Sequence, residues 1–183
     1  PQLGRANLPE LVETLEHRNA WHRETAARLI YERQDQRVVP LLEKVLRVSN
    51  SALGRMHALH ALDGLGALTP MQLEQALGDA DERVREHAVL LAEAMIKVSQ
   101  ATRLNPESTG PLPGLTVRLL RLTNDPAIHV RYQLAFTLGE IRHPDKIPAL
   151  AAIVRRDAAD PWVRAAVLSS LADDSGAMFR ELT

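Results

Sequence analysis

The chain has 183 residues, of which 45% are hydrophobic, 25% charged and only 3% aromatic, and it carries 22 basic against 23 acidic side chains. This balance excludes a long-range field favouring nucleic acid or an anionic membrane. The absence of cysteine excludes disulfides, thiolate metal sites and Cys-x-x-Cys-His haem attachment. No apolar run reaches the ~18 residues that span a bilayer, so direct membrane insertion is not expected.

A short motif centred on an arginine recurs along the chain. It gives an aligned series of Arg23, Arg55, Arg85, Arg131 and Arg164, at intervals of 32, 30, 46 and 33 residues. The positions three, four and seven residues after each Arg are apolar, which is the stripe of an amphipathic helix. A near-constant period of this length is typical of stacked helix pairs.

Each arginine-bearing helix is preceded by another that has a proline near its start, where proline is tolerated. We therefore predict five helix pairs, each with a first and a second helix, in repeats of about 8–34, 38–66, 69–98, 112–142 and 144–172. The long interval is explained by an inserted loop at about 97–114, which is rich in Pro, Gly, Ser, Thr and Asn. A truncated helix follows at about 174–183, and we expect the chain to be a segment of a longer protein.

No pair can bury its apolar face alone, so stacking must supply the core. The predicted fold is all-α: a single α-solenoid domain, 1–183, of about five stacked helix pairs. Between the helices of the pairs lie residues that favour turns and cap helix N-termini: Asn19, Ser51, Asp79, Asp81, Asp125 and Asp160.

The arginine series has two interpretations. A row of cations could bind phosphate or carboxylate ligands. Alternatively, each guanidinium could bond the Asp or the backbone carbonyls of an adjacent inter-helix turn and tie two repeats together. We favour the structural role for Arg23, Arg55, Arg85, Arg131 and Arg164, because a residue present in every repeat serves the repeat.

Several strings resemble known proteins. The units "NDPAIHVR" and "ADPWVR" resemble the short HEAT repeats of phycobilisome bilin lyases. A further resemblance is carried by five strings in this order: "WHRETAARLIYERQDQRVVPLLEKVL", "GRMHALHALDGLGAL", "VREHAVLLAEA", "VRYQLAFTLGEI" and "DPWVRAAVLSSL". They resemble the helical domain of putative membrane-bound dehydrogenases of planctomycete-type bacteria. That resemblance implies a β-propeller before this region, a cytochrome c module after it, and a periplasmic or cell-envelope location. The redox residues of that family lie outside this region.

The second helices are predicted to present a concave face that binds a partner protein. The positions two and five residues after each arginine carry its candidate residues, which are Thr25, Arg28, His57, His60, His87, Leu90, Gln133 and Phe136. His57, His60 and His87 are also lesser candidates for metal or haem contact. Trp21 and Trp162 each lie two residues before their arginine, and we expect them to pack in the turns rather than anchor a partner.

The leading functional hypothesis is a non-catalytic protein-interaction or spacer module without cofactor, catalytic residues or metal, set in a larger redox protein. Its partners would be proteins: other domains of the parent chain or a separate protein. The alternative is a chromophore- or metal-contacting protein like the bilin lyases, using the His-bearing face. A DNA-binding protein like the HEAT-like alkylpurine glycosylases is disfavoured by the charge balance. The sequence has no His-Glu-x-x-His motif, no nucleophile elbow and no Gly-rich phosphate loop.

Overall fold

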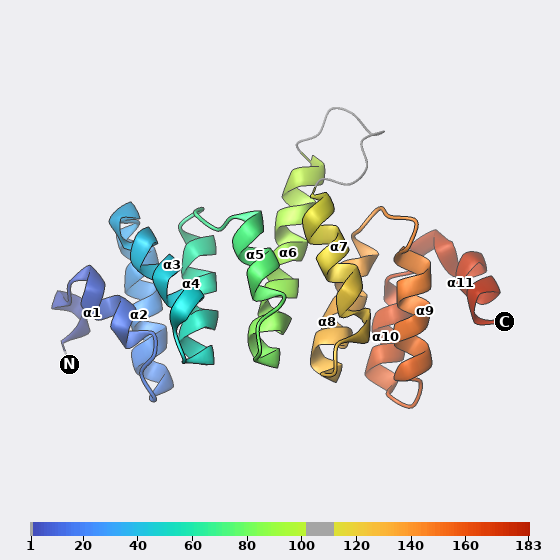
Figure 1. The fold of residues 1–183 in the computed structure, drawn as a ribbon, viewed down its shortest axis with the longest axis horizontal. Helices are drawn as coiled ribbons and strands as arrows, with labels where there is room; N and C mark the ends of the chain where they lie inside the picture. The colour runs from blue at the N-terminus through green and yellow to red at the C-terminus, as the bar shows by residue number, and fades with distance from the viewer. Residues whose placement is uncertain (1, 102–111) are drawn as a thin grey trace. The chain divides into compact units, whose positions relative to one another are not determined.

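The computed structural model of the chain describes residues 2–101 and 112–183, and every regular element in these ranges is helical (Figure 1). The α-helices are α1 (Leu8–Thr14), α2 (Ala20–Arg33), α3 (Val39–Val48), α4 (Ala52–Gly64), α5 (Pro70–Ala76), α6 (Glu82–Ala101), α7 (Pro113–Arg121), α8 (Ile128–Gly139), α9 (Lys146–Arg156), α10 (Pro161–Ser169) and α11 (Ser175–Leu182). Short 3-10 helices are η1 (Leu3–Arg5), η2 (Gln36–Val38), η3 (Leu122–Asn124) and η4 (Ala172–Asp174). The pairs α1/α2, α3/α4, α5/α6, α7/α8 and α9/α10 coincide with the five expected pairs.

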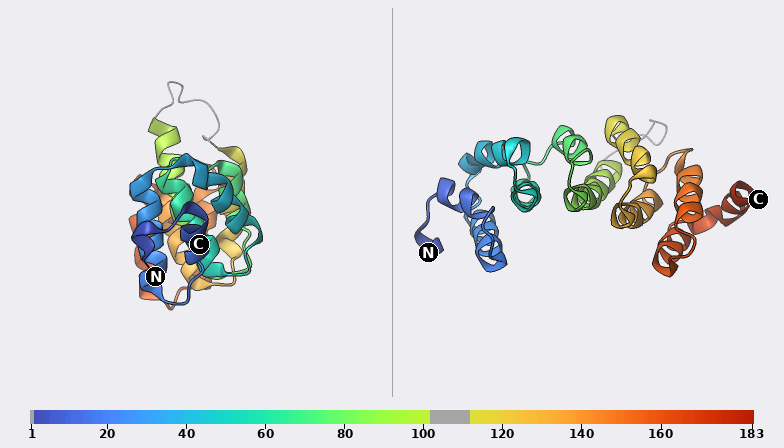
Figure 2. Two further views of the ribbon diagram at one scale, coloured as in Figure 1. Left: turned by 90° about the vertical axis from the view of Figure 1, so that its left-hand side faces the viewer. Right: turned by 60° about the horizontal axis from the view of Figure 1, so that its bottom comes forward.

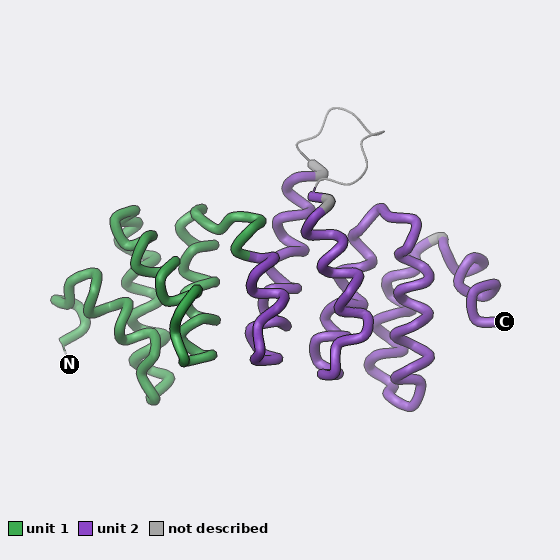
Figure 3. The backbone as a smooth tube through the Cα atoms, viewed as in Figure 1, with its two compact units in different colours: residues 1–72 green, residues 73–183 purple. Residues whose placement is uncertain are grey.

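The chain divides into two compact units, residues 1–72 and residues 73–183, and the boundary falls within α5 (Figure 3). Each unit has its own core of fully buried leucine and isoleucine. The first unit buries Leu11, Leu15, Ile30, Leu42, Leu59 and Leu62. The second unit buries Leu73, Ile96, Leu115, Leu119, Leu134 and Leu138. Within the second unit, the first helices α7 and α9 form one layer and the second helices α8 and α10 form the other (Figure 2).

Local sequence explains where several helices begin. Asn7 caps α1 in a capping box with Glu10, and Asp160 caps α10 by accepting hydrogen bonds from the backbone N–H groups of Trp162 and Val163. Asn19 and Ser51 cap α2 and α4 in the same way. Asp125, in contrast, precedes the α8 cap Ala127 by two residues, which leaves its carboxylate available to other partners.

The predicted inserted loop is wrong at both ends. Helix α6 continues through residues 97–101, and α7 already begins at Pro113. Lys97 supports the extended helix because its ammonium group pairs with Glu93 one turn earlier, at 2.8 Å. Residues 97–101 contain neither proline nor glycine, so their polar composition alone did not mark a helix end. The rest of the predicted insert, residues 102–111, lies outside the described residues.

The apolar stripe of the second helices is buried as expected in the middle repeats, with one exception at the end of the series. Leu134, Ala135 and Leu138 are fully buried on α8, but Leu168 on α10 is 69% exposed. Helix α10 is the last of the second helices, and the helix that follows, α11, packs against α9. The side of α10 that carries Leu168 therefore lacks the neighbour that covers the same position on α8.

Gly139 at the end of α8 marks a close approach between second helices. A Cβ atom there would lie 2.9 Å from Ser170 Cβ and 3.1 Å from Ser170 Cα. Ser170 is itself held by a hydrogen bond from its hydroxyl to the Ala166 carbonyl. We expect Gly139→Ala to lower the free energy of unfolding by about 1–3 kcal/mol, because backbone must move to admit the methyl group. Urea denaturation of the variant measures this change.

Gly114 provides the matched control for that substitution. It also lies in a helix, but the atoms that a Cβ would meet belong to the flexible Glu74 side chain. Gly114→Ala is therefore expected to be neutral or to stabilise the protein by up to about 1 kcal/mol through helix propensity. Equal destabilisation by both variants would contradict the close approach at Gly139.

Candidate functional site: the second-helix face

The eight residues predicted to bind a partner lie on second helices in both units. In the first unit, Thr25 and Arg28 lie on α2, and His57 and His60 on α4. In the second unit, His87 and Leu90 lie on α6, and Gln133 and Phe136 on α8. We call the exposed surface of α6, α8 and α10 in the second unit the second-helix face.

The first-unit candidates are partly engaged within the protein. Arg28 forms an ion pair with Glu32 at 2.9 Å, one turn along the same helix. The Nε2 atom of His57 accepts a hydrogen bond from Nε of Arg23 at 3.3 Å. Thr25 is half-buried. These first-unit candidates are polar, and the exposed apolar side chains of the first unit, such as Trp21 and Tyr31 of α2, are not among them.

The three histidines are divided between the units, with His57 and His60 in the first and His87 in the second. Within residues 2–101 and 112–183, no group of three or more His, Asp or Glu side chains is arranged to hold a metal ion. Metal or chromophore contact through these histidines stays a prediction without a supporting geometry.

The arginine series forms a repeated contact. In every repeat the guanidinium Nη1 donates a hydrogen bond to the backbone carbonyl six residues earlier, in the turn that precedes its own helix. The distances are 2.7 Å for Arg23, 2.7 Å for Arg55, 2.8 Å for Arg85, 2.5 Å for Arg131 and 2.5 Å for Arg164. This bond ties the second helix to the turn from which it starts.

In the second unit, two of these arginines also reach the following repeat. Arg85 donates from Nε and Nη2 to the two carboxylate oxygens of Asp125, at 2.7 and 2.8 Å. Arg131 makes the same two-bond contact with Asp157, at 2.7 and 2.6 Å. All four side chains are largely buried, and the Asp125 carboxylate raises the pKa of Arg85. These pairs are planar, charge-assisted contacts of the kind that only arginine makes.

Asp125 links the two pairs into a chain. Its carboxylate accepts from Arg85, while its backbone carbonyl accepts from Arg131. The sequence indicated that Asp125 is a turn residue but did not indicate Asp157. Asp125 lies six residues before Arg131, whereas Asp157 lies seven residues before Arg164. The buried guanidinium groups of Arg85 and Arg131 are thus occupied by protein groups, and they do not line the second-helix face.

The second-helix face carries exposed apolar side chains. Leu90 on α6 is 45% exposed and Phe136 on α8 is 36% exposed. The Phe136 ring packs edge-to-face against Tyr132, with ring centroids 5.2 Å apart. Trp162 at the start of α10 is 71% exposed, so the expectation that it packs in its turn is wrong. Its backbone N–H donates to Oδ1 of Asp160 at 2.8 Å. Trp21 is likewise 59% exposed.

A pocket of about 260 Å³ lies between the N-terminal ends of α8 and α10. It is lined by Ile128, His129, Tyr132, Asp160, Trp162 and Val163. The positions two and five residues after each arginine do not include these side chains. Tyr132 lies one residue after Arg131, and Trp162 lies two residues before Arg164. These two repeat positions are three residues apart and share one face of a second helix, so following them along the sequence identifies the site.

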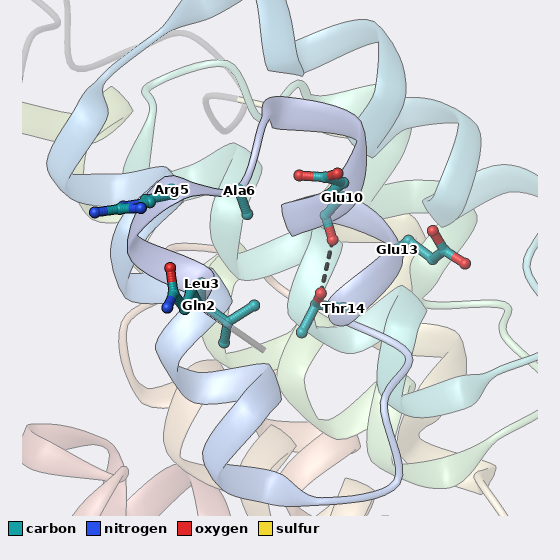
Figure 4. Close-up of a pocket in the computed structure, with 7 residues that line it drawn as sticks. All are labelled: Gln2, Leu3, Arg5, Ala6, Glu10, Glu13 and Thr14. Atoms are coloured by element: carbon teal, nitrogen blue, oxygen red, sulfur yellow. Dashed lines mark hydrogen bonds between the residues drawn. The ribbon is translucent and has the colours of Figure 1, made fainter.

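A larger pocket, of about 410 Å³, lies in the first unit between η1 and α1. Its charged side chains do not converge: Arg5 and Glu13 point in opposite directions in Figure 4. Glu10 accepts a hydrogen bond from the Asn7 backbone in the capping box, and its carbonyl accepts one from the Thr14 hydroxyl at 2.6 Å (Figure 4). These contacts stabilise α1 and leave no constellation suited to catalysis.

Comparison with known proteins supports the fold. Residues 115–176, which span α7 to α10, match the model of the HEAT repeats family. The chain is therefore similar to HEAT repeats over this third of its length. A designed armadillo repeat protein, YIII(Dq)4CqI, matches 96% of this chain over 87% of its own, with a TM-score of 0.53 and 18% sequence identity. That likeness concerns the fold alone, and the search of curated proteins found no match.

The predicted fold class is confirmed: the chain is an α-solenoid with helix pairs of the HEAT and armadillo type. The resemblance to HEAT repeats is likewise confirmed at this level. Within the described residues, none of the helices combines the length and apolar character needed to cross a membrane.

Proposed function

We propose that this chain is a non-catalytic protein-interaction module that binds a partner on the second-helix face and spaces the parts of a larger protein. The observation that carries the proposal is the exposure of Leu90, Phe136 and Trp162 on second helices whose own cores are already filled. Trp162 lines the pocket between α8 and α10 together with the half-buried Tyr132, whose ring contacts Phe136. Aromatic side chains of this kind are enriched among the anchors of protein interfaces.

The repeat fold supports a binding role. Stacked helix pairs form extended surfaces, and solenoids of the HEAT and armadillo type typically act as interaction scaffolds rather than as enzymes. The pairs Arg85–Asp125 and Arg131–Asp157 keep neighbouring second helices in fixed register. A surface held in this way loses little conformational entropy when a partner binds.

The setting we propose is a multidomain redox protein with a β-propeller before this region and a cytochrome c module after it. The support is the order of the repeat strings along the chain. The coding sequence on both sides of this region tests the proposal. A Cys-x-x-Cys-His motif downstream is expected, with haem staining of the full-length protein; a parent protein without either module would overturn this setting.

Selection from a phage-displayed library of random 12-residue peptides tests the binding role. We expect enriched peptides that bind the wild-type chain and lose at least about tenfold in affinity with Phe136→Glu or Leu90→Glu, because a charge is placed among the apolar contacts. Val117→Glu is the matched control, since Val117 is 46% exposed on the first helix α7. Failure to enrich any peptide, or equal losses with the control, would overturn the proposal.

A further inference from the structure

The pocket between α8 and α10 combines aromatic rings with a single carboxylate. Tyr132 of α8 lines one wall of the pocket, and Trp162 at the start of α10 lines the other. Asp160, the N-cap residue of α10, also lines the pocket. We propose that this pocket binds the arginine side chain of a basic peptide segment in a partner protein. The inference rests on the proposed function and specifies the chemistry of the partner.

The aromatic rings provide faces on which a guanidinium group can stack. Trp162 is 71% exposed, which leaves most of its ring accessible. The Tyr132 ring stands nearly perpendicular to that of Phe136, at an interplanar angle of 89°, and this edge-to-face contact fixes its orientation. Arginine stacks on Trp and Tyr faces through cation–π attraction, and it does so more often than lysine.

The charge of the pocket complements a cation. Among its six lining residues, the titratable side chains besides Tyr132 are those of Asp160 and His129, and the carboxylate of Asp160 is the one acidic group. One carboxylate oxygen, Oδ1, accepts the helix-capping bonds from the Trp162 and Val163 backbone, at 2.8 and 3.0 Å. The other oxygen, Oδ2, has no hydrogen-bond donor within the described residues. A guanidinium group stacked on one of the aromatic rings of the pocket would supply that donor.

The buried pair Arg131–Asp157 holds the two walls of the pocket in place. Arg131 directly precedes Tyr132, and its guanidinium forms the two bonds to Asp157. The Asp157 carbonyl in turn accepts a hydrogen bond from the Asp160 backbone at 2.9 Å. The turn that carries Asp160 and Trp162 is thereby fixed to α8. This pre-organisation lowers the entropy cost of binding a side chain between the walls.

The sequence allows a direct optical test, because the chain contains only two tryptophans, Trp21 and Trp162. In the Trp21→Phe variant of the full chain, all tryptophan emission comes from Trp162. The probes are a hexapeptide of alternating Arg and Ser and the same peptide with citrulline in place of each Arg. Citrulline keeps the planar shape of the side chain and removes its charge.

We expect the arginine peptide to change Trp162 emission saturably and to bind about tenfold more tightly than the citrulline peptide. Asp160→Asn should weaken the arginine peptide by roughly threefold, because asparagine still caps the helix but carries no charge. Tyr132→Ala should weaken it by about tenfold. Asp145→Asn, which removes an exposed carboxylate elsewhere in the unit, is the control and should leave the affinity unchanged.

Equal affinity for the two peptides would overturn the inference, as would equal effects of Asp160→Asn and Asp145→Asn. Either result leaves the proposed function standing if library peptides still bind in a Phe136-dependent way. If no library peptide depends on Phe136, the proposed function fails, and an arginine-specific response of Trp162 would then support a side-chain pocket without a wider docking surface.

Discussion

Arg131→Ala is expected to lower the free energy of unfolding by about 3–5 kcal/mol. The variant would leave the Asp157 carboxylate, whose side chain is 8% exposed, without its partner in a poorly solvated site. It would also remove a donor from the carbonyls of Asp125 and Pro126. Urea denaturation followed by circular dichroism measures the change.

Arg164→Ala is the matched control for this prediction. Arg164 occupies the same repeat position and bonds the carbonyl of Ala158, but it is exposed and forms no ion pair within the described residues. We expect a loss below about 1 kcal/mol. A loss of several kcal/mol from Arg164→Ala, or a negligible loss from Arg131→Ala, would contradict this prediction. It would show that the ion pair to the next repeat does not make Arg131 more important for stability than Arg164.

Leu134→Ala is expected to cost about 2–5 kcal/mol, whereas Phe136→Ala on the same helix should cost less than about 1 kcal/mol. Leu134 is fully buried and its truncation leaves a cavity. Phe136 is exposed, and its removal costs mainly the contact with Tyr132. The two residues lie two positions apart, so the comparison tests which side of α8 faces the core.

The same pair should behave in the opposite way when binding is measured. Phe136→Ala is expected to weaken peptides selected against the second-helix face, while Leu134→Ala should alter their affinity only through stability. Thermal denaturation and peptide binding on both variants check this separation. A large loss of stability from Phe136→Ala would place its side chain in the core and remove it from the candidate site.

Most of the fold could be predicted from the sequence because the repeat is periodic in several independent ways. The arginine position, the apolar stripe after it and the proline at the start of each first helix all indicate the same helix pairs. The helix ends were harder to place. Residues 97–101 have a polar composition, yet they continue α6, and Lys97 pairs there with Glu93 and, at 3.4 Å, with Glu140 at the C-terminal end of α8.

The candidate site was less predictable than the fold. Leu90 and Phe136, which the repeat spacing selected as partner-surface candidates, are exposed. The spacing did not single out Tyr132, Asp160 and Trp162 as a group. These three residues come from different repeat positions on two helices. The contact between Arg131 and Asp157 holds the two helices together at this point. Asp157 lies seven residues before the arginine of its own repeat, whereas Asp125 lies six residues before its own, so the repeat pattern does not reveal the contact. Long-range side-chain contacts of this kind leave little trace in a local pattern.

Arg85 and Arg131 join neighbouring repeats of the second unit, and we propose that the partner binds beside them on the second-helix face. A double-mutant cycle with Arg131→Ala, Asp157→Ala and the double variant tests the first part most directly, by urea denaturation. We predict a coupling free energy of about 2–3 kcal/mol, because each single variant strands a buried charge and the double variant strands none. A coupling near zero would contradict the claim and return Arg131 to consideration as a ligand-binding residue.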